Sequence, residues 1–232
     1  MSSDVDTAAA AALIANRARC AMLDALFDGG EWTAGSLAGV AGIAPSTASG
    51  HLRMLVDGGL IALQQRGRRQ FARLASPEVA HALEALSTIA PTIPSQTLRA
   101  SSRAQALRQA RTCYDHLAGA LGVALTDALC AAGVLAGDDL APTAHGTAQL
   151  QRFGIDLPSL QSRRRPLTRA CLDWSERRAH LAGALGAALC QELIDRAWIA
   201  RMPEPRIVRL TPAGQHGLAH TFGLIHIPEP AT

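Results

Sequence analysis

Cysteine, aspartate and histidine recur together in two short segments, at spacings that suit the binding of a soft metal ion. Cys113 and His116 stand three positions apart, so on one helix they would share a face and could chelate a single ion. The second segment repeats the Cys-x-Asp pattern and offers a histidine further along. If the two segments pack about a pseudo-twofold axis, their thiolates and imidazoles converge on a tetrahedral site for zinc or another soft metal. The candidate metal or inducer residues are Cys113, Asp115, His116, Cys171, Asp173 and His180.

The same segments allow three other interpretations. A buried cysteine often serves only as a small hydrophobe, and each His-Leu-Ala-Gly run that follows could simply start a helix. Cys113 and Cys171 could instead form a disulfide on oxidation, provided that their Cα atoms lie within about 7 Å. An organic inducer could also bind between the two segments, in the C-terminal half of the chain, which holds most of the few aromatic residues: Tyr114, Phe153, Trp174, Trp198 and Phe222.

Two further groups of potentially reactive residues are expected to be ordinary. Glu78, His81 and Glu84 share one face of a predicted helix and could bind a metal ion, but exposed acids and histidines on a helix are usually solvated. Cys130 and Cys190 lie in apolar helices and are expected in the core. The five cysteines are an odd number in a chain without an export signal, so no disulfide framework is predicted.

A second set of residues suits contact with DNA. In the predicted helix 45–57, apolar residues recur at helical spacing and must face a core, whereas small hydroxyl residues and Arg53 face outward. Hydroxyls early in such a helix can enter a major groove and hydrogen-bond base edges. Arginines near the tip of the next hairpin would reach phosphates or the adjacent minor groove. The predicted DNA-binding residues are Pro45, Ser46, Thr47, Ser49, Gly50, His51, Arg53, Arg66, Arg68 and Arg69.

These side chains must be positioned by a helix-turn-helix with a β-hairpin wing. Apolar residues every four positions predict the first helix, and Thr33 is placed to cap a short second one. Pro45 suits the first position of the third helix, and Gly67 supplies the turn of the hairpin. The predicted elements are helices at 8–28, after Thr33, at 45–57 and at 77–89, and strands at 60–63 and 70–74.

An internal repeat lies beyond a linker at 91–95. The run from His116 to Gly122 recurs at 180–186, and weaker matches continue on both sides. Each copy is expected to form a helix, a short hairpin and a helix, which predicts two degenerate winged-helix-like repeats packed as a pseudo-dimer. The chain is thus predicted to be mainly α with short β-hairpins. Its predicted domains are a winged helix-turn-helix at 8–91 and a sensing and dimerisation domain at 97–232, with repeats at about 113–156 and 171–225.

Composition narrows the class of protein. The 232 residues are 48% hydrophobic, which is typical of a globular chain. All 22 basic residues are arginine and the net charge is only +3, so basic charge matters through its clustering near Arg66 rather than its total. No apolar run is long enough to span a membrane, and the N-terminus lacks the basic start of a signal peptide. We therefore expect a cytoplasmic protein without a membrane partner.

The run from Ile43 to Ile61, followed by 66–74, resembles the ArsR/SmtB regulators over about residues 8–90. Their signature is a Ser-x-His-Leu recognition helix, a Gly-Leu-Ile/Val strand start and an Arg-x-Gly-Arg wing. The resemblance implies a homodimer formed through the first and last helices of this domain. It also implies a repressor that an inducer, often a metal ion or metalloid, releases from double-stranded operator DNA. The family's Cys-x-Cys metal site is absent, because the second helix reads Leu-Ala-Gly-Val at 37–40.

Two other classes of function compete with a DNA-binding regulator. One is a redox- or metal-dependent thiol enzyme that uses Cys113 and His116 on a winged-helix scaffold. The other is a protein-interaction module whose winged folds bind partners instead of DNA. No glycine-rich phosphate loop, nucleophile elbow or His-Glu-x-x-His motif is present, so we expect that the chain is not an enzyme. The inducer, the operator and the choice between repression and activation cannot be read from the sequence.

Overall fold

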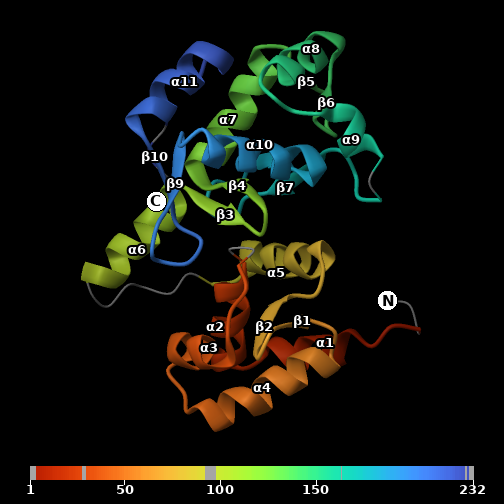
Figure 1. The fold of residues 1–232 in the computed structure, drawn as a ribbon, viewed down its shortest axis with the longest axis vertical. Coiled ribbons are helices and arrows are strands. Elements are labelled where there is room, and N and C mark those ends of the chain that lie inside the picture. The colour runs from red at the N-terminus through yellow and green to blue at the C-terminus, as the bar shows by residue number, and fades with distance from the viewer. Residues whose placement is uncertain (1–3, 28–29, 92–97, 163, 228, 230–232) are drawn as a thin grey trace. The chain divides into compact units, whose positions relative to one another are not determined.

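The computed structural model describes residues 4–27, 30–91, 98–162, 164–227 and 229, and divides into two compact units, 1–82 and 83–232 (Figure 1). Each unit has its own buried core. Among the described residues, no helix has both the length and the apolar character needed to span a membrane.

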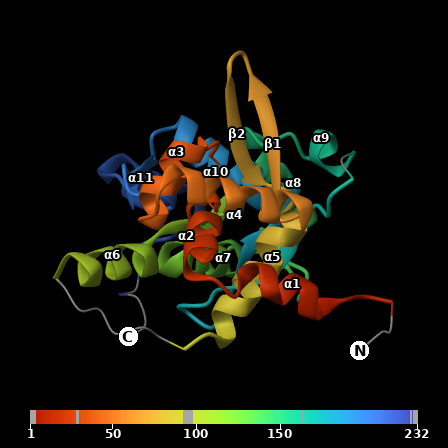
Figure 2. The ribbon, with the colours of Figure 1, turned by 90° about the horizontal axis from the view of Figure 1, so that it is seen from below.

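The first unit is a winged helix-turn-helix, as the sequence predicts. Helix α4 follows α3 after a three-residue turn, and Pro45 stands at its first position, where the missing N–H costs no hydrogen bond. The wing is an antiparallel hairpin of two six-residue strands, and it extends beyond the helices of its unit in Figure 2. The elements are α1 (Thr7–Ile14), α2 (Arg17–Leu26), α3 (Ala34–Ala41), α4 (Pro45–Asp57), β1 (Ile61–Arg66), β2 (Arg69–Leu74) and the start of α5 (Pro77–Ile89).

The single helix predicted over 8–28 is wrong, because the chain forms two helices there. Asn16 has an extended backbone, and its side-chain oxygen accepts hydrogen bonds from the backbone N–H groups of Ala18 and Arg19 at 3.0 and 3.1 Å. This capping starts α2 afresh and ends the helical run before it. The apolar periodicity alone could not reveal the break, because α2 continues the same spacing.

Apolar side chains of three helices and the wing form the core of the first unit. Met22, Leu37 and Leu55 are fully buried and come from α2, α3 and α4. The wing contributes Leu74, and the outer face of α4 is left free of core contacts. The core therefore fixes α4 with its hydroxyl-rich face exposed.

The second unit is built from helices and short two-stranded antiparallel hairpins. Helices α7 and α10 supply more residues to its core than any other element, and Phe153, Ile199 and Phe222 pack with them. The elements after α5 are α6 (Leu98–Gln109), β3 (Arg111–Cys113), β4 (His116–Ala118), α7 (Gly119–Ala131), β5 (Leu135–Ala136), β6 (Ala141–Pro142), α8 (Ala144–Arg152), α9 (Leu157–Gln161), β7 (Arg169–Leu172), β8 (Ala179–Ala182), α10 (Gly183–Asp195), β9 (Ile199–Arg201), β10 (Val208–Leu210) and α11 (Pro212–Phe222).

Residues 111–152 and 169–222 have the same order of elements: hairpin, helix, hairpin, helix, with α9 between them. The order differs from the predicted helix, hairpin and helix, because each copy opens with a hairpin. The description of these segments as two degenerate winged-helix repeats stays an interpretation.

The division between the units falls within α5, between Ala82 and Leu83, and not at the predicted linker, most of which lies outside the described residues. The last turns of α5 belong to the second unit because they bond to its other residues. Glu84 pairs with two buried arginines of that unit, and the carbonyl of Thr88 accepts a hydrogen bond from Arg177.

Candidate functional site

Cys113 and His116 lie opposite each other on the β3–β4 hairpin, so their predicted place on one helix is wrong. A two-residue turn joins the strands, and Tyr114 in it has a φ of 62°, the left-handed region common in tight hairpins. A spacing of three fits a helix face and a hairpin pair equally well. The two side chains still meet, but through strand pairing.

The second copy repeats this arrangement on the β7–β8 hairpin. Cys171 lies opposite His180 in the strand register, and the loop between them begins with Asp173. Because the loop is longer, the sequence separation of nine residues does not disclose the pairing. Each hairpin thus presents one thiol and one imidazole.

The two hairpins bring all four side chains to one buried point. One ligand atom from each of Cys113, His116, Cys171 and His180 lies within 4.8 Å of every other. The Nε2 atoms of the two histidines are 3.1 Å apart. With Zn–N bonds of 2.0–2.1 Å, the edge of a tetrahedron between two nitrogens is about 3.3 Å. Two cysteines and two histidines at these distances fit a tetrahedral zinc-type centre.

Glycines in the repeated His-Leu-Ala-Gly-Ala-Leu-Gly run allow this convergence. A Cβ on Gly122 of α7 would lie 2.6 Å from the carbonyl oxygen of Leu117, and one on Gly186 of α10 would lie 2.5 Å from that of Leu181. The same added Cβ atoms on Gly122 and Gly186 would lie 3.8 and 3.4 Å from the Cβ atoms of His180 and His116. Each helix therefore packs closely on the histidine of the other copy. This contact explains why the run occurs twice.

A carboxylate lies behind each histidine. Asp115 Oδ1 lies 3.3 Å from Nδ1 of His116, and Asp173 Oδ2 lies 3.3 Å from Nδ1 of His180. Nδ1 of His116 is hydrogen-bonded to its carboxylate, whereas Nδ1 of His180 lies near Asp173 without a hydrogen bond to it; the two Nε2 atoms face each other. This is the usual arrangement around a metal-bound histidine, in which a carboxylate orients the ring and increases its basicity. Asp115 and Asp173, both predicted site residues, lie outside the four-residue group and contact its histidines.

The surroundings of Cys113 favour its protonated thiol when no metal is bound. A hydrogen bond with Cys171 and then burial raise the pKa of Cys113 to about 12. Burial lowers the pKa of His180, but contacts with Asp173 and Cys113 outweigh it and raise that pKa to about 9. A metal ion at this centre must therefore displace protons.

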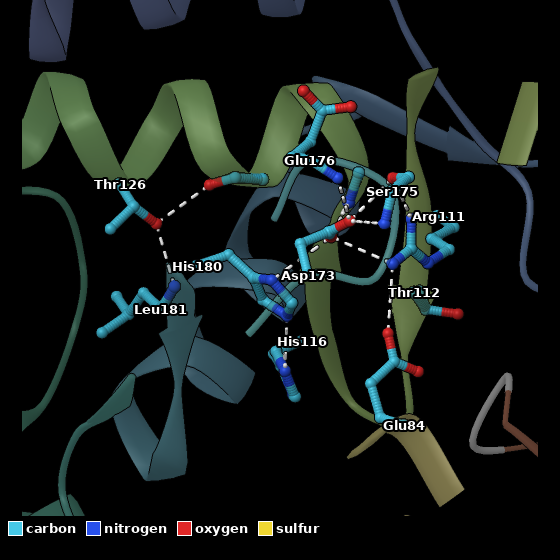
Figure 3. A network of polar contacts seen from close by, with 12 residues as sticks. Glu84, Arg111, Thr112, His116, Thr126, Asp173, Ser175, Glu176, His180 and Leu181 are labelled. Carbon is cyan, nitrogen blue, oxygen red and sulfur yellow. Dashed lines mark hydrogen bonds and ion pairs between the residues drawn. The ribbon is translucent and has the colours of Figure 1, made fainter. Parts of the chain in front are cut away.

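Asp173 connects the second histidine to a chain of buried charges (Figure 3). Its Oδ2 accepts hydrogen bonds from the backbone N–H of Gly119 at 2.7 Å and from Nη2 of Arg111 at 3.0 Å. The same Arg111 nitrogen donates to Glu84 on α5 at 3.1 Å. Glu84 also accepts from Arg206 at 3.4 Å. The expectation that Glu84 is solvated is wrong, because these arginines bury it.

The predicted DNA-binding residues lie together on the first unit. On α4, the side chains at 45–47, 49, 50 and 53 are exposed, and the hydroxyl of Ser49 donates to the carbonyl of Pro45 at 3.0 Å. On the wing, Arg66, Arg68 and Arg69 are exposed, and Arg66 pairs with Glu31 at 2.8 Å. Arg68 and Arg69 stand at or beside the tip, which suits phosphate contact.

His51 differs from its neighbours on α4. It is half-buried, and its Nδ1 lies 3.4 Å from a guanidinium nitrogen of Arg19 on α2. That guanidinium also donates to backbone carbonyls at Ala12 and Leu13 at the end of α1. His51 therefore links α4 to α2 and can offer only its remaining ring edge to DNA.

Sequence reasoning missed two residues of the buried charge chain behind the site, Arg111 and Arg206, and it expected the third, Glu84, to be solvated. Arg111 stands two residues before Cys113 and is fully buried, but nothing in the sequence names its partners. Cys190 is buried as expected, whereas Cys130 is exposed near the end of α7, so its predicted place in the core is wrong. Phe153 and Phe222 pack edge to face in the core, and the ring of Trp198 lies tilted against Phe153.

Comparison with known proteins places the chain in a family. Residues 14–64 match the family model described as a helix-turn-helix domain. YdfF of Bacillus subtilis, an uncharacterised HTH-type transcriptional regulator, is 40% identical over 205 residues, which span 88% of this chain and 91% of the relative.

Two solved structures overlap about a third of the chain. One is the homodimeric winged helix-turn-helix DNA-binding domain of a possible ArsR-family regulator from Mycobacterium bovis, at 31% identity, with a TM-score of 0.34 over 36% of this chain and 76% of the other. The other is the cadmium sensor CMTR of Mycobacterium tuberculosis, at 31% identity, with a TM-score of 0.33 over 39% and 93%. With its 40% identity to YdfF and its winged N-terminal unit, the chain belongs to the HTH-type transcriptional regulators, and the ArsR resemblance predicted for residues 8–90 covers the matched helix-turn-helix domain.

Proposed function

We propose that the chain is a homodimeric, metal-responsive repressor that binds operator DNA through α4 and the wing. The observation that carries the metal response is the buried group of Cys113, His116, Cys171 and His180. Zinc is the ion that fits best, because it favours two thiolates and two imidazoles in a tetrahedron. Because its operator DNA would lie in the cytoplasm, the protein would act there.

The DNA-binding part of the proposal rests on the surface of the first unit. The core holds α4 with Ser46, Thr47 and Ser49 exposed on its first turns, where a recognition helix meets base edges. The exposed Arg68 and Arg69 of the wing add sequence-independent attraction to phosphates. These features favour a DNA-binding function over a protein-interaction module.

A homodimer is proposed because α1 buries none of its residues within the chain, although its sequence, Thr-Ala-Ala-Ala-Ala-Ala-Leu-Ile, is apolar. On the last turns of α5, Leu86 and Ile89 are also exposed. Helices with uncovered apolar residues mark surfaces that another chain covers. Two copies related by a twofold axis would present two recognition helices to a palindromic operator.

The experiment measures metal and DNA binding on the same full-length protein. Protein purified under reducing conditions should bind one zinc ion per chain by elemental analysis, and cobalt in its place should show the absorption of tetrahedral thiolate coordination. Zinc should weaken operator binding, measured by fluorescence anisotropy, by about five- to 150-fold. Cys113→Ser should lose both the cobalt spectrum and the zinc effect, whereas Cys130→Ser, at an exposed thiol, should keep both.

Two results would contradict the proposal. One is the absence of bound metal with no change in operator affinity on titration with zinc, cadmium or arsenite. The other is the absence of a sequence-specific complex with DNA at any salt concentration, which would favour a thiol enzyme or an interaction module.

A second candidate input is an organic molecule, which a specific cavity favours. The second unit holds an apolar cavity of about 480 Å³, within the range of small-molecule sites, lined among others by Ala110, Leu121, Leu218 and Leu224. An organic inducer there would change operator affinity in Cys113→Ser as strongly as in the unaltered protein.

A further inference from the structure

The two carboxylates behind the histidines have opposite surroundings. Asp115 and its partner Arg165 keep 28% and 26% of their side chains exposed. Asp173 and its partner Arg111 are fully buried. A change at His116 is therefore screened by solvent, whereas a change at His180 acts on charges in a low-dielectric interior.

A single oxygen of Asp173 is shared among three groups. Oδ2 accepts from the backbone of Gly119 and from Arg111, and it lies 3.3 Å from Nδ1 of His180. A metal on Nε2 of this ring fixes the proton on Nδ1 and makes it a stronger donor. Nδ1 of His180 has no hydrogen-bond partner among the described residues, so metal binding would create a hydrogen bond from it to Asp173 at the expense of the contact with Arg111.

A weaker contact between Arg111 and Asp173 also changes the contact between Arg111 and Glu84, because one nitrogen of Arg111 bonds to both acids. Nη2 is 3.0 Å from Asp173 and 3.1 Å from Glu84. When the pull of Asp173 weakens, this nitrogen moves toward Glu84. The central carbon of the guanidinium lies 4.6 Å from the centre of the Trp174 ring, and its other terminal nitrogen, Nη1, donates to Ser175 at 3.1 Å, so Nη2 is the nitrogen shared between the two acids.

Glu84 lies on the helix that continues the DNA-binding unit. Helix α5 begins at Pro77, three residues after the last residue of the wing strand β2. Its final turns carry Glu84, which pairs with Arg111, and Thr88, whose carbonyl accepts a hydrogen bond from Arg177. The backbone of α5 is therefore the continuous covalent element between the wing and the buried charges.

We infer that His180, Asp173, Arg111 and Glu84 form a relay that transmits metal binding at the four-ligand centre to α5. The inference rests on the proposed metal response. Asp173 and Arg111 act as positioning residues, and Glu84 is the point at which the second unit sets the position of the helix. The duplicated carboxylate Asp115 takes no part in the transmission.

The test compares three variants of the full chain for zinc affinity, by competition with a chromophoric chelator, and for operator affinity with and without saturating zinc. Glu84→Gln should keep the zinc affinity of the unaltered protein, because Glu84 contacts no ligand, but should reduce the zinc effect on operator binding to less than about twofold. Asp115→Asn, the matched control, should weaken zinc binding by about 10–100-fold yet retain the full operator response at saturation. Asp173→Asn should lose both the zinc affinity of the unaltered protein and the operator response to zinc.

The outcomes separate this inference from the proposed function. If the unaltered protein binds no zinc or its operator affinity ignores zinc, the proposed function fails and the relay falls with it. If the unaltered protein responds and folded Glu84→Gln responds equally, only the relay is overturned. Hydrogen exchange on the unaltered protein needs no variant: zinc should change the protection of the amides of residues 83–89, and unchanged exchange there would also overturn it.

Discussion

At the scale of single residues, close packing of glycine against backbone sets the metal-type centre. Gly122 and Gly186 let α7 and α10 approach the strands that carry the histidines. At these positions glycine is required because there is no room for a side chain, and its backbone flexibility matters less. Ala at either position would push a helix away from a carbonyl oxygen and move the histidine on the other hairpin.

We expect Gly122→Ala to destabilise the protein by about 1–3 kcal/mol, because its Cβ would lie 2.6 Å from the Leu117 carbonyl oxygen. Gly39→Ala on α3 is the matched control, since no atom lies within 4 Å of the added Cβ, and it should stabilise by about 0.5–1 kcal/mol. Urea unfolding followed by circular dichroism measures both changes. Equal effects of the two substitutions would contradict the packing argument.

At the scale of secondary-structure elements, the DNA-binding unit could be predicted from the sequence and the site hairpins could not. Helix α4 has a clear apolar period, Pro45 at its start and glycines at its end, all local signals. The segment from Cys113 to His116 has none of these, and its spacing fits a helix or a hairpin. The pairing of Arg111 with Glu84 spans 27 positions and that of Arg206 with Glu84 spans 122, so no local pattern encodes them.

The recognition helix and the wing should contribute differently to DNA binding. Arg68→Ala should weaken binding to all sequences and lower the salt slope by about one, because it removes a phosphate contact. Ser49→Ala should change which operator is preferred. Anisotropy titrations of two operators over a range of salt concentrations measure both effects. Arg66→Ala is the internal comparison and should cost less, because Glu31 already neutralises Arg66; identical behaviour of all three variants would contradict the division.

At the scale of the whole molecule, the uncovered apolar surface argues for assembly. Ile89 on α5 and Ile225 beyond α11 are 79% and 82% exposed. Because their exposure is similar, Ile225 can serve as the control for a substitution at Ile89. Only Ile89 lies on a helix that the ArsR resemblance implies for dimer contacts. The oligomeric state therefore tests which surface another copy covers.

We expect Ile89→Glu to shift the protein from dimer to monomer and to weaken operator binding, because a buried, unpaired carboxylate is costly at an interface. Ile225→Glu should leave the dimer intact. Sedimentation velocity at several protein concentrations measures the equilibrium. A dimer that tolerates Ile89→Glu would show that another surface holds the copies together.

The burial of all four candidate ligands also has a consequence for timing. An ion enclosed by Cys113, His116, Cys171 and His180 has no open coordination position, so it can leave only when one hairpin separates from the other. Its escape rate is then the rate of local unfolding, not of ligand exchange in water. A regulator built in this way would average the metal supply over long intervals and ignore brief fluctuations.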